Sequence, residues 1–299
     1  MGVRAKTITI IGLVFLAATA ATWGATVGLI QSEYIKLEAD NVSKDTARSV
    51  DALGAKVDQL ALKIPDWSSW DDTYQFIADH NQDYLDSNVQ NSALQNLSIN
   101  FMVFINAKQQ IVESVGVDTD TGDSIPLPAE LTKAIAPGGK LLATRPDDAW
   151  SGILYAKAHP IIIATRPILR TDGTGPLRGT LVFAQYLTPA GVAKLGEITH
   201  LSVAYDPPLA PGGALVSEAA GASTTKARTQ TKGASAIEGF QLINDIYGKP
   251  VLVAHVTETR SIYQETQRTL LFYMIVVAAV TFAALLVAIY TTGQIRRQD

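Results

Sequence analysis

Acidic and aromatic side chains gather in one short stretch of the chain. Residues 65–76 read PDWSSWDDTYQF and hold two of the four tryptophans, a tyrosine, a phenylalanine and three aspartates. Aromatic side chains with polar ends, placed beside a carboxylate, can form the wall of a ligand pocket. The same aromatic stripe can also serve as an ordinary core, which is the more frequent use of such a pattern. The chemistry to expect here is binding.

The spacing of this stretch predicts a helix that brings its aromatic side chains together. Pro65 ends the helical pattern before it, and Asp66 is placed to cap a new helix. Residues spaced three, four and three apart share one face of such a helix, with Asp71 beside them. They are Trp67, Trp70, Tyr74 and Ile77.

A single arginine lies inside an apolar segment further along the chain. Arg166 belongs to GILYAKAHPIIIATRPIL, which has the composition of a buried strand. Its charge must turn outward, pair with an acid such as Asp71, or hold the carboxylate of a ligand. We therefore predict a small-molecule site whose ligand has an unknown identity and charge. Its residues are Trp67, Trp70, Asp71, Tyr74 and Arg166.

The sequence offers no catalytic or metal-binding pattern. It has no cysteine, and its four histidines are far apart and outside any HExxH arrangement. GTGPLRG lacks the spacing of a phosphate-binding loop and is interpreted as a hairpin turn. DTDTGD resembles the start of a calcium loop but has no Glu at the twelfth position, so we interpret it as a solvated loop. We expect no enzyme activity, no cofactor and no metal.

Two uncharged apolar runs, residues 7–30 and 270–290, are each long enough to cross a bilayer. Basic residues lie before the first run and after the second, so both termini are expected in the cytoplasm and the segment between in the periplasm. The chain is then a two-pass protein of the inner membrane. A cleaved signal peptide is the alternative, because 18–20 read Ala-Thr-Ala, but the apolar run continues about ten residues further. A net charge of −4 argues against nucleic acid as a partner.

These signals divide the chain into three parts. Residues 1–31 form a cytoplasmic tip and a transmembrane helix, 32–268 a periplasmic domain, and 269–299 a second transmembrane helix with a short tail. Within the domain we expect a long helix over 32–64, a sheet core over 65–263 and a flexible loop over about 206–239.

LSINFMVFI with QIVESVGV, and GILYAKAHPIIIATRPIL with TLVFAQYL, are interpreted as two hairpins. A short helix follows, with Thr188 as its cap and Pro189 at its first position, and a last strand pair comes after it. These strand pairs and short helices predict an α+β fold, a mixed antiparallel sheet with flanking helices.

Two features favour a homodimer. Gly24 and Gly28 form a GxxxG pair in the first apolar run, which permits close packing of two helices. The expected long helix carries an apolar stripe with coiled-coil spacing. Its dimerisation residues are Val50, Leu53, Val57 and Leu60. The alternative is that this stripe packs on its own domain.

Four segments occur in a fixed order between the two apolar runs: DWSSWDDTYQF, INFMVFINAKQQIV, GPLRGTLVFAQYL and LINDIYGKPVLV with TRSIY after it. In this order they resemble the fourth type of CHASE domain, an extracytoplasmic sensor of bacterial signalling proteins. The resemblance covers most of residues 65–263 and implies a PAS-like or Cache-like sheet.

The resemblance also implies a cytoplasmic output module. In this family that module is a histidine kinase or a diguanylate cyclase or phosphodiesterase of cyclic-di-GMP signalling. The chain ends at Asp299, so we expect the module to lie outside it and the chain to be the input half of a receptor. The alternative is a membrane-anchored scaffold whose outer domain binds a protein partner.

Overall fold

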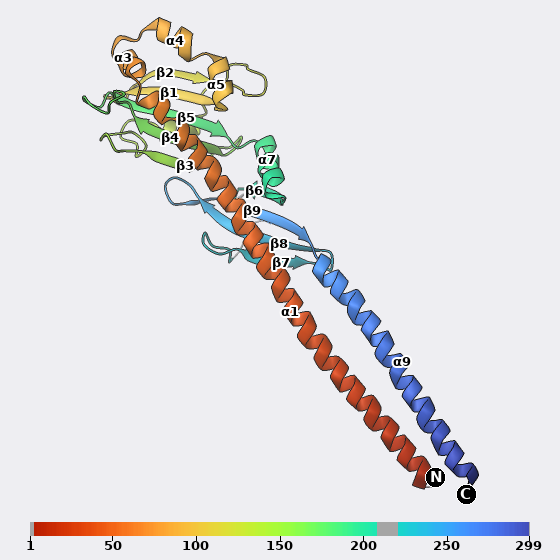
Figure 1. Cartoon of the computed structure of the whole chain (residues 1–299). Coiled ribbons are helices and arrows are strands. Elements are labelled where there is room, and N and C mark those ends of the chain that lie inside the picture. Colours follow the sequence, from red (N-terminus) through yellow and green to blue (C-terminus); the bar gives the residue numbers. More distant parts are fainter. Residues whose placement is uncertain (1–2, 208–220, 299) are drawn as a thin grey trace. The chain divides into compact units, whose positions relative to one another are not determined.

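The computed structural model describes residues 3–207 and 221–298, which form two compact units (Figure 1). One unit comprises Met1–Val42, Thr229–Glu238 and Thr257–Asp299, and the other comprises Ser43–Arg228 and Gly239–Val256. The longest element is helix α1, Val3–Lys63, which contributes residues to both units. The predicted long helix is thus confirmed, and it ends where Pro65 stops it.

The larger unit, Ser43–Arg228 with Gly239–Val256, is built on a five-stranded antiparallel sheet. Its strands are β1 (Phe101–Asn106), β2 (Ile111–Gly116), β3 (Trp150–Leu154), β4 (Ile161–Pro167) and β5 (Gly179–Tyr186). Their order is β2-β1-β5-β4-β3, and every neighbouring pair is antiparallel. The two predicted hairpins are confirmed, although the segment around Arg166 forms two strands, β3 and β4, where one was expected.

Both faces of this sheet are covered, which explains why β4 reads as a continuous apolar run. Successive side chains of a strand point to opposite faces. Met102, Ala164 and Phe183 therefore enter one core, together with Leu53 of α1. Side chains one position away on the same strands enter a second core with helix α6 (Ala129–Ala134). The result is the α+β, PAS/Cache-like architecture that was predicted.

Short helices surround the sheet. They are α2 (Pro65–Ser68), α3 (Asp71–Asp79), α4 (Gln82–Asn88), α5 (Asn91–Leu97), α6 and α7 (Pro189–Thr199). The Thr188 side chain caps α7 by accepting from the backbone N–H of Gly191, as its position before Pro189 predicted. The single helix expected over 67–77 is wrong, because Trp70 has an extended backbone, φ −128° and ψ 132°. Residues 65–79 form two helices, α2 and α3.

The remaining strands form a second sheet, whereas the sequence had suggested one sheet for all strands. Its members are β6 (Ser202–Asp206), β7 (Arg228–Lys232), β8 (Ala236–Asn244) and β9 (Pro250–Thr259), in the order β6-β9-β8-β7. Residues 208–220 of the predicted flexible loop lie outside the described residues. From 228 onward the loop prediction is wrong, because a tight turn with φ 67° at Gly233 joins β7 to β8.

The smaller unit contains the membrane-type helices, the start of α1 and helix α9 (Ser261–Gln298). The stretches Gly12–Ser68 and Ser261–Val287 each contain an 18-residue window that is apolar enough to cross a membrane, with mean hydropathies of 1.8 and 2.7. Their large apolar side chains lie open, for example Leu29 and Phe272, each 69% exposed. Trp23 of α1 stacks on Tyr273 of α9, with ring centroids 6.1 Å apart.

Candidate functional site

The two tryptophans of the acidic and aromatic stretch pack against the sheet. Trp67 of α2 meets Trp70 edge to face at 6.1 Å between centroids, and it meets Phe183 of β5 at 6.3 Å. Trp70 lies 5.9 Å from the ring of Tyr84. Both tryptophans are half-buried and lie against the core that also contains Leu53. They therefore retain exposed ring surface beside a fully buried interior.

The next aromatic residues form an ordinary core. Phe76 stacks on Tyr84 at 4.8 Å and meets Phe104 edge to face at 5.2 Å. The Tyr84 hydroxyl is 2.7 Å from the Thr73 hydroxyl, and burial raises the pKa of Tyr84 to about 12. These rings bury apolar area and leave no group free to bind a ligand. For this part of the stretch the core interpretation is the correct one.

Two polar groups near Trp67 have no partner among the described residues. The hydroxyl of Ser68 belongs to a fully buried residue and makes no hydrogen bond. Its backbone carbonyl accepts from Leu169 N–H at 2.9 Å, which places Ser68 directly beside the end of β4. Within β4 itself, the half-buried Arg166 makes no side-chain hydrogen bond or ion pair with any described residue.

The register of the sheet shows what surrounds Arg166. Arg166 is opposite Leu181 of β5, which in turn is opposite Phe104 of β1. By strand alternation Arg166 shares a face with Ala164, the face that packs on α1 and Trp67. A guanidinium in such surroundings has donors to offer to a carboxylate or phosphate. The arrangement can bind an anion against an apolar and aromatic wall.

Asp71 and Tyr74 contact the loop between β4 and β5, and their predicted part in a ligand site stays a prediction. Asp71 is exposed; its N–H donates to Thr171 Oγ1 at 3.2 Å, and its Oδ1 accepts from Thr171 N–H at 3.3 Å. The possible Asp71–Arg166 pair is therefore absent. The Tyr74 ring lies between the guanidiniums of Arg170 and Arg178, at 4.9 and 4.0 Å. These contacts attach α3 to the loop between β4 and β5.

The predicted dimerisation residues fall into two groups. Leu53 and Leu60 are 1% and 3% exposed in the core of their own unit, with Val50 and Val57 packed half-buried against it. A buried side chain offers no surface to a second copy, so the prediction that this stripe forms a dimer interface is wrong for Leu53 and Leu60. The alternative prediction, that the stripe packs on its own domain, agrees with the position of Leu53 and of Leu60. Gly24 and Gly28 lie on open helix surface with nothing within 4 Å of an added Cβ.

Sequence reasoning missed a buried ion pair in the smaller unit. Glu38 of α1 and Arg260, the residue before α9, have side chains only 4% and 7% exposed, and Arg260 Nε donates to Glu38 Oε2 at 3.0 Å. Glu38 Oε1 accepts from Tyr263 N–H at 2.7 Å, and Arg260 Nη1 donates to the carbonyl of Gly233 at 3.1 Å.

A sequence signal for this pair did exist. The buried stripe of α1, continued toward the N-terminus with helical spacing, meets Val42 and then Glu38. A carboxylate at an otherwise buried position needs a cation. The sequence alone does not say which arginine supplies it. In the part of the chain that the structure describes, no three acidic or histidine side chains gather as metal ligands.

Comparison with known proteins places these features in a family. A family model described as the CHASE4 domain matches residues 52–206, just over half of the chain. The methanogenesis regulatory histidine kinase FilI of Methanothrix harundinacea is 24% identical over 207 residues, 68% of this chain and 22% of that kinase. The chain therefore spans about a fifth of the length of this curated relative.

Solved structures give a weaker similarity. The extracellular domain of the histidine kinase vpHK1S-Z8 is 12% identical with a TM-score of 0.49, over 79% of this chain and 96% of that one. The periplasmic domain of Vibrio cholerae LuxQ is 10% identical with a TM-score of 0.47, over 72% and 98% of the two chains.

Proposed function

The chain belongs to the CHASE4 domain family, and we propose that it is the sensing and membrane-spanning region of a two-pass bacterial receptor. The family match covers the half of the chain that holds the five-stranded sheet. The two apolar helices lie on either side of this domain in the sequence. These two findings together support a domain that is held at a membrane.

In this proposal the domain between the spans, about residues 32–268, is periplasmic, and both termini are cytoplasmic. The support is the basic residues that flank the apolar runs on their outer ends, such as Arg4 and Arg297. Alkaline phosphatase and green fluorescent protein fusions test this. Phosphatase activity at Lys194 and fluorescence after Asp299 are expected, and the same location for both positions would contradict the topology.

We further propose that the domain binds a small organic acid between α2 and β4. The observation that carries this proposal is the unpaired Arg166 on the sheet face that packs on Trp67. The buried, unpaired hydroxyl of Ser68 supplies a second polar group, and the half-buried rings of Trp67 and Trp70 supply the apolar wall. Asp71 and Tyr74 act indirectly, because they hold the neighbouring β4–β5 loop.

A thermal-shift screen of carboxylates against the full chain in detergent tests the site. An acid present at a hundredfold excess over its dissociation constant should stabilise the chain by about 2.7 kcal/mol. Arg166→Met should remove this gain, whereas Arg145→Met, a 71% exposed arginine between α6 and β3, should keep it. The site is refuted if no acid stabilises the wild type, or if both variants respond as the wild type does.

We propose that the receptor is a homodimer that contacts its partner through the first apolar helix and passes a conformational signal to a cytoplasmic output module. The open helix surface at Gly24 and Gly28 supports this contact. Single cysteines in this cysteine-free chain at Gly24 or Gly28 should crosslink in membranes, and a cysteine at Leu53, which is 1% exposed, should not. Equal crosslinking at all three positions would refute the interface.

A further inference from the structure

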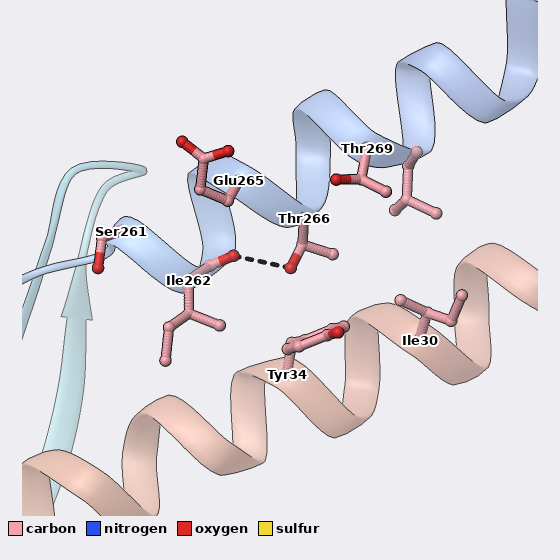
Figure 2. A pocket seen from close by; sticks show the side chains of 8 residues that line it. Ile30, Tyr34, Ser261, Ile262, Glu265, Thr266 and Thr269 are labelled. Atoms are coloured by element: carbon pink, nitrogen blue, oxygen red, sulfur yellow. Dashed lines mark hydrogen bonds between the residues drawn. The ribbon is translucent and has the colours of Figure 1, made fainter.

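A groove opens between α1 and the first turns of α9 in the smaller unit (Figure 2). Its volume is about 430 Å³. Ile30 and Tyr34 of α1 project toward Thr266 and its neighbours on α9, as Figure 2 shows. The complete lining is Ile30, Tyr34, Ser261, Ile262, Glu265, Thr266, Thr269 and Leu270.

The groove changes from apolar to polar along its length. Ile30 is the last residue of the first apolar run, and Leu270 is the first residue of the second. Ser261 lies nine residues before Leu270, about 13 Å along a helix that rises 1.5 Å per residue. The interfacial layer outside the hydrocarbon core is roughly 5–8 Å thick on each side of a bilayer. The groove thus extends from the edge of the hydrocarbon through the layer of lipid headgroups.

A carboxylate lines the polar end of the groove, and its guanidinium partner lies outside the lining. Glu265 lines the groove and forms an exposed pair with Arg268, 3.3 Å between Oε1 and Nη1. The Thr266 hydroxyl donates to the carbonyl of Ile262 at 2.7 Å, so its oxygen stays available as an acceptor. A carboxylate, a hydroxyl oxygen and a nearby guanidinium together complement a headgroup that has an ammonium donor and a phosphate.

We propose that this groove binds one phospholipid of the outer leaflet whose zwitterionic headgroup carries a primary ammonium, as in phosphatidylethanolamine. Exposed apolar side chains beside the groove, such as Leu29 and Leu271, bring acyl chains to its apolar end. The ammonium binds Glu265 and the phosphate binds Arg268. The bound lipid contacts both helices at once, so it stabilises their pairing just outside the membrane.

The test is native mass spectrometry of the full chain released from nanodiscs that contain equal amounts of phosphatidylethanolamine, phosphatidylcholine and phosphatidylglycerol. The wild type should retain one phosphatidylethanolamine at least fivefold more often than either other lipid. Glu265→Gln, at a side chain 72% exposed, should keep the fold and lose the preference over phosphatidylcholine, whose trimethylammonium cannot donate a hydrogen bond.

A pair of matched tryptophan variants tests whether the lipid binds in this groove. Thr266→Trp fills the groove and should abolish retention. Thr281→Trp changes a threonine of the same helix that makes the same bond to the residue four before it, and it should retain lipid as the wild type does. Equal retention of all three lipids, a preference for phosphatidylglycerol, or normal retention by Thr266→Trp would overturn the inference. It rests on the proposed topology, which the reporter fusions test separately.

Discussion

The buried pair of Glu38 and Arg260 gives the sharpest quantitative prediction. Glu38→Gln keeps the size of the side chain and removes its charge, so Arg260 loses the only carboxylate that the described residues place against it. Removing one partner of a buried ion pair costs about 3–5 kcal/mol, because the other charge stays buried without compensation. Both side chains are under 10% exposed, so solvent does not reduce this cost.

Hydrogen exchange of the full chain in nanodiscs measures this cost locally. The Tyr263 amide donates to Glu38 Oε1 at 2.7 Å. The rate at which this amide opens to exchange therefore reports how stable the ion pair is. A loss of about 3–5 kcal/mol should accelerate its exchange by roughly 10²–10⁴-fold. Glu33→Gln removes an exposed pair of α1 with Lys36, whose side chains are 71% and 69% exposed, and should leave the Tyr263 amide unchanged.

A double variant separates two free energies. One is the cost of leaving the buried Arg260 without its carboxylate, and the other is the net stabilisation that the intact pair contributes. Glu38→Gln with Arg260→Met removes both charges, and replacing a buried pair by apolar groups is often close to neutral. The exchange rate of the Tyr263 amide in the double variant should therefore return most of the way to the wild-type rate. Unchanged exchange in Glu38→Gln would refute the reasoning. A double variant that opens as fast as Glu38→Gln would refute it equally.

Two further predictions concern the larger unit. Burial raises the pKa of Tyr84 and of Tyr205 to about 12, so their contribution to stability is complete below pH 10, the unfolded value, and is lost as pH rises toward 12. The free energy of unfolding should fall by up to about 3 kcal/mol per tyrosine over that range, and Tyr205→Phe should remove about half of the combined fall, because Tyr84 still titrates. Gly179→Ala should cost about 3 kcal/mol or more, because φ is 150° and an added Cβ would lie 1.8 Å from the carbonyl oxygen of Ile105. Gly173→Ala, with φ 73° and open space, should cost about 1 kcal/mol by thermal unfolding. A flat alkaline profile, or equal costs at the two glycines, would contradict these predictions.

Local patterns were enough to predict much of the fold. The α1 periodicity, the Thr188 cap and the strand-type composition of β1 and β2 are each visible within a few residues, and the structure has the helix, the cap and the hairpin. The break at Trp70 lies next to two hydrogen bonds between Asp71 and Thr171, which are 100 residues apart. Helical spacing alone contains no signal for such a contact.

The sequence indicated only some of the residues of the proposed site, for the same reason. The sequence indicated Trp67, Trp70 and Arg166, because aromatic rings and a lone charge in apolar surroundings are visible locally. Ser68 was missed, since a serine is informative only once its hydroxyl is known to be buried and unpaired. Leu53 fitted a coiled-coil pattern and an own-domain core equally well, because both need the same spacing.

The ion pair also offers a test that distinguishes a receptor from a passive scaffold. Signal transmission needs an element with two discrete arrangements. A shift of α1 by 1–2 Å, a typical movement in such transitions, would take Glu38 out of hydrogen-bond reach of Tyr263 N–H and Arg260 Nε, which are at 2.7 and 3.0 Å. The pair is therefore either formed or broken. With a histidine kinase fused after Asp299, Glu38→Gln should change basal kinase output at least severalfold, and Glu33→Gln, which removes only an exposed pair, should not. Equal output from all three chains would mean that the pair only ties two helices together, as a scaffold requires.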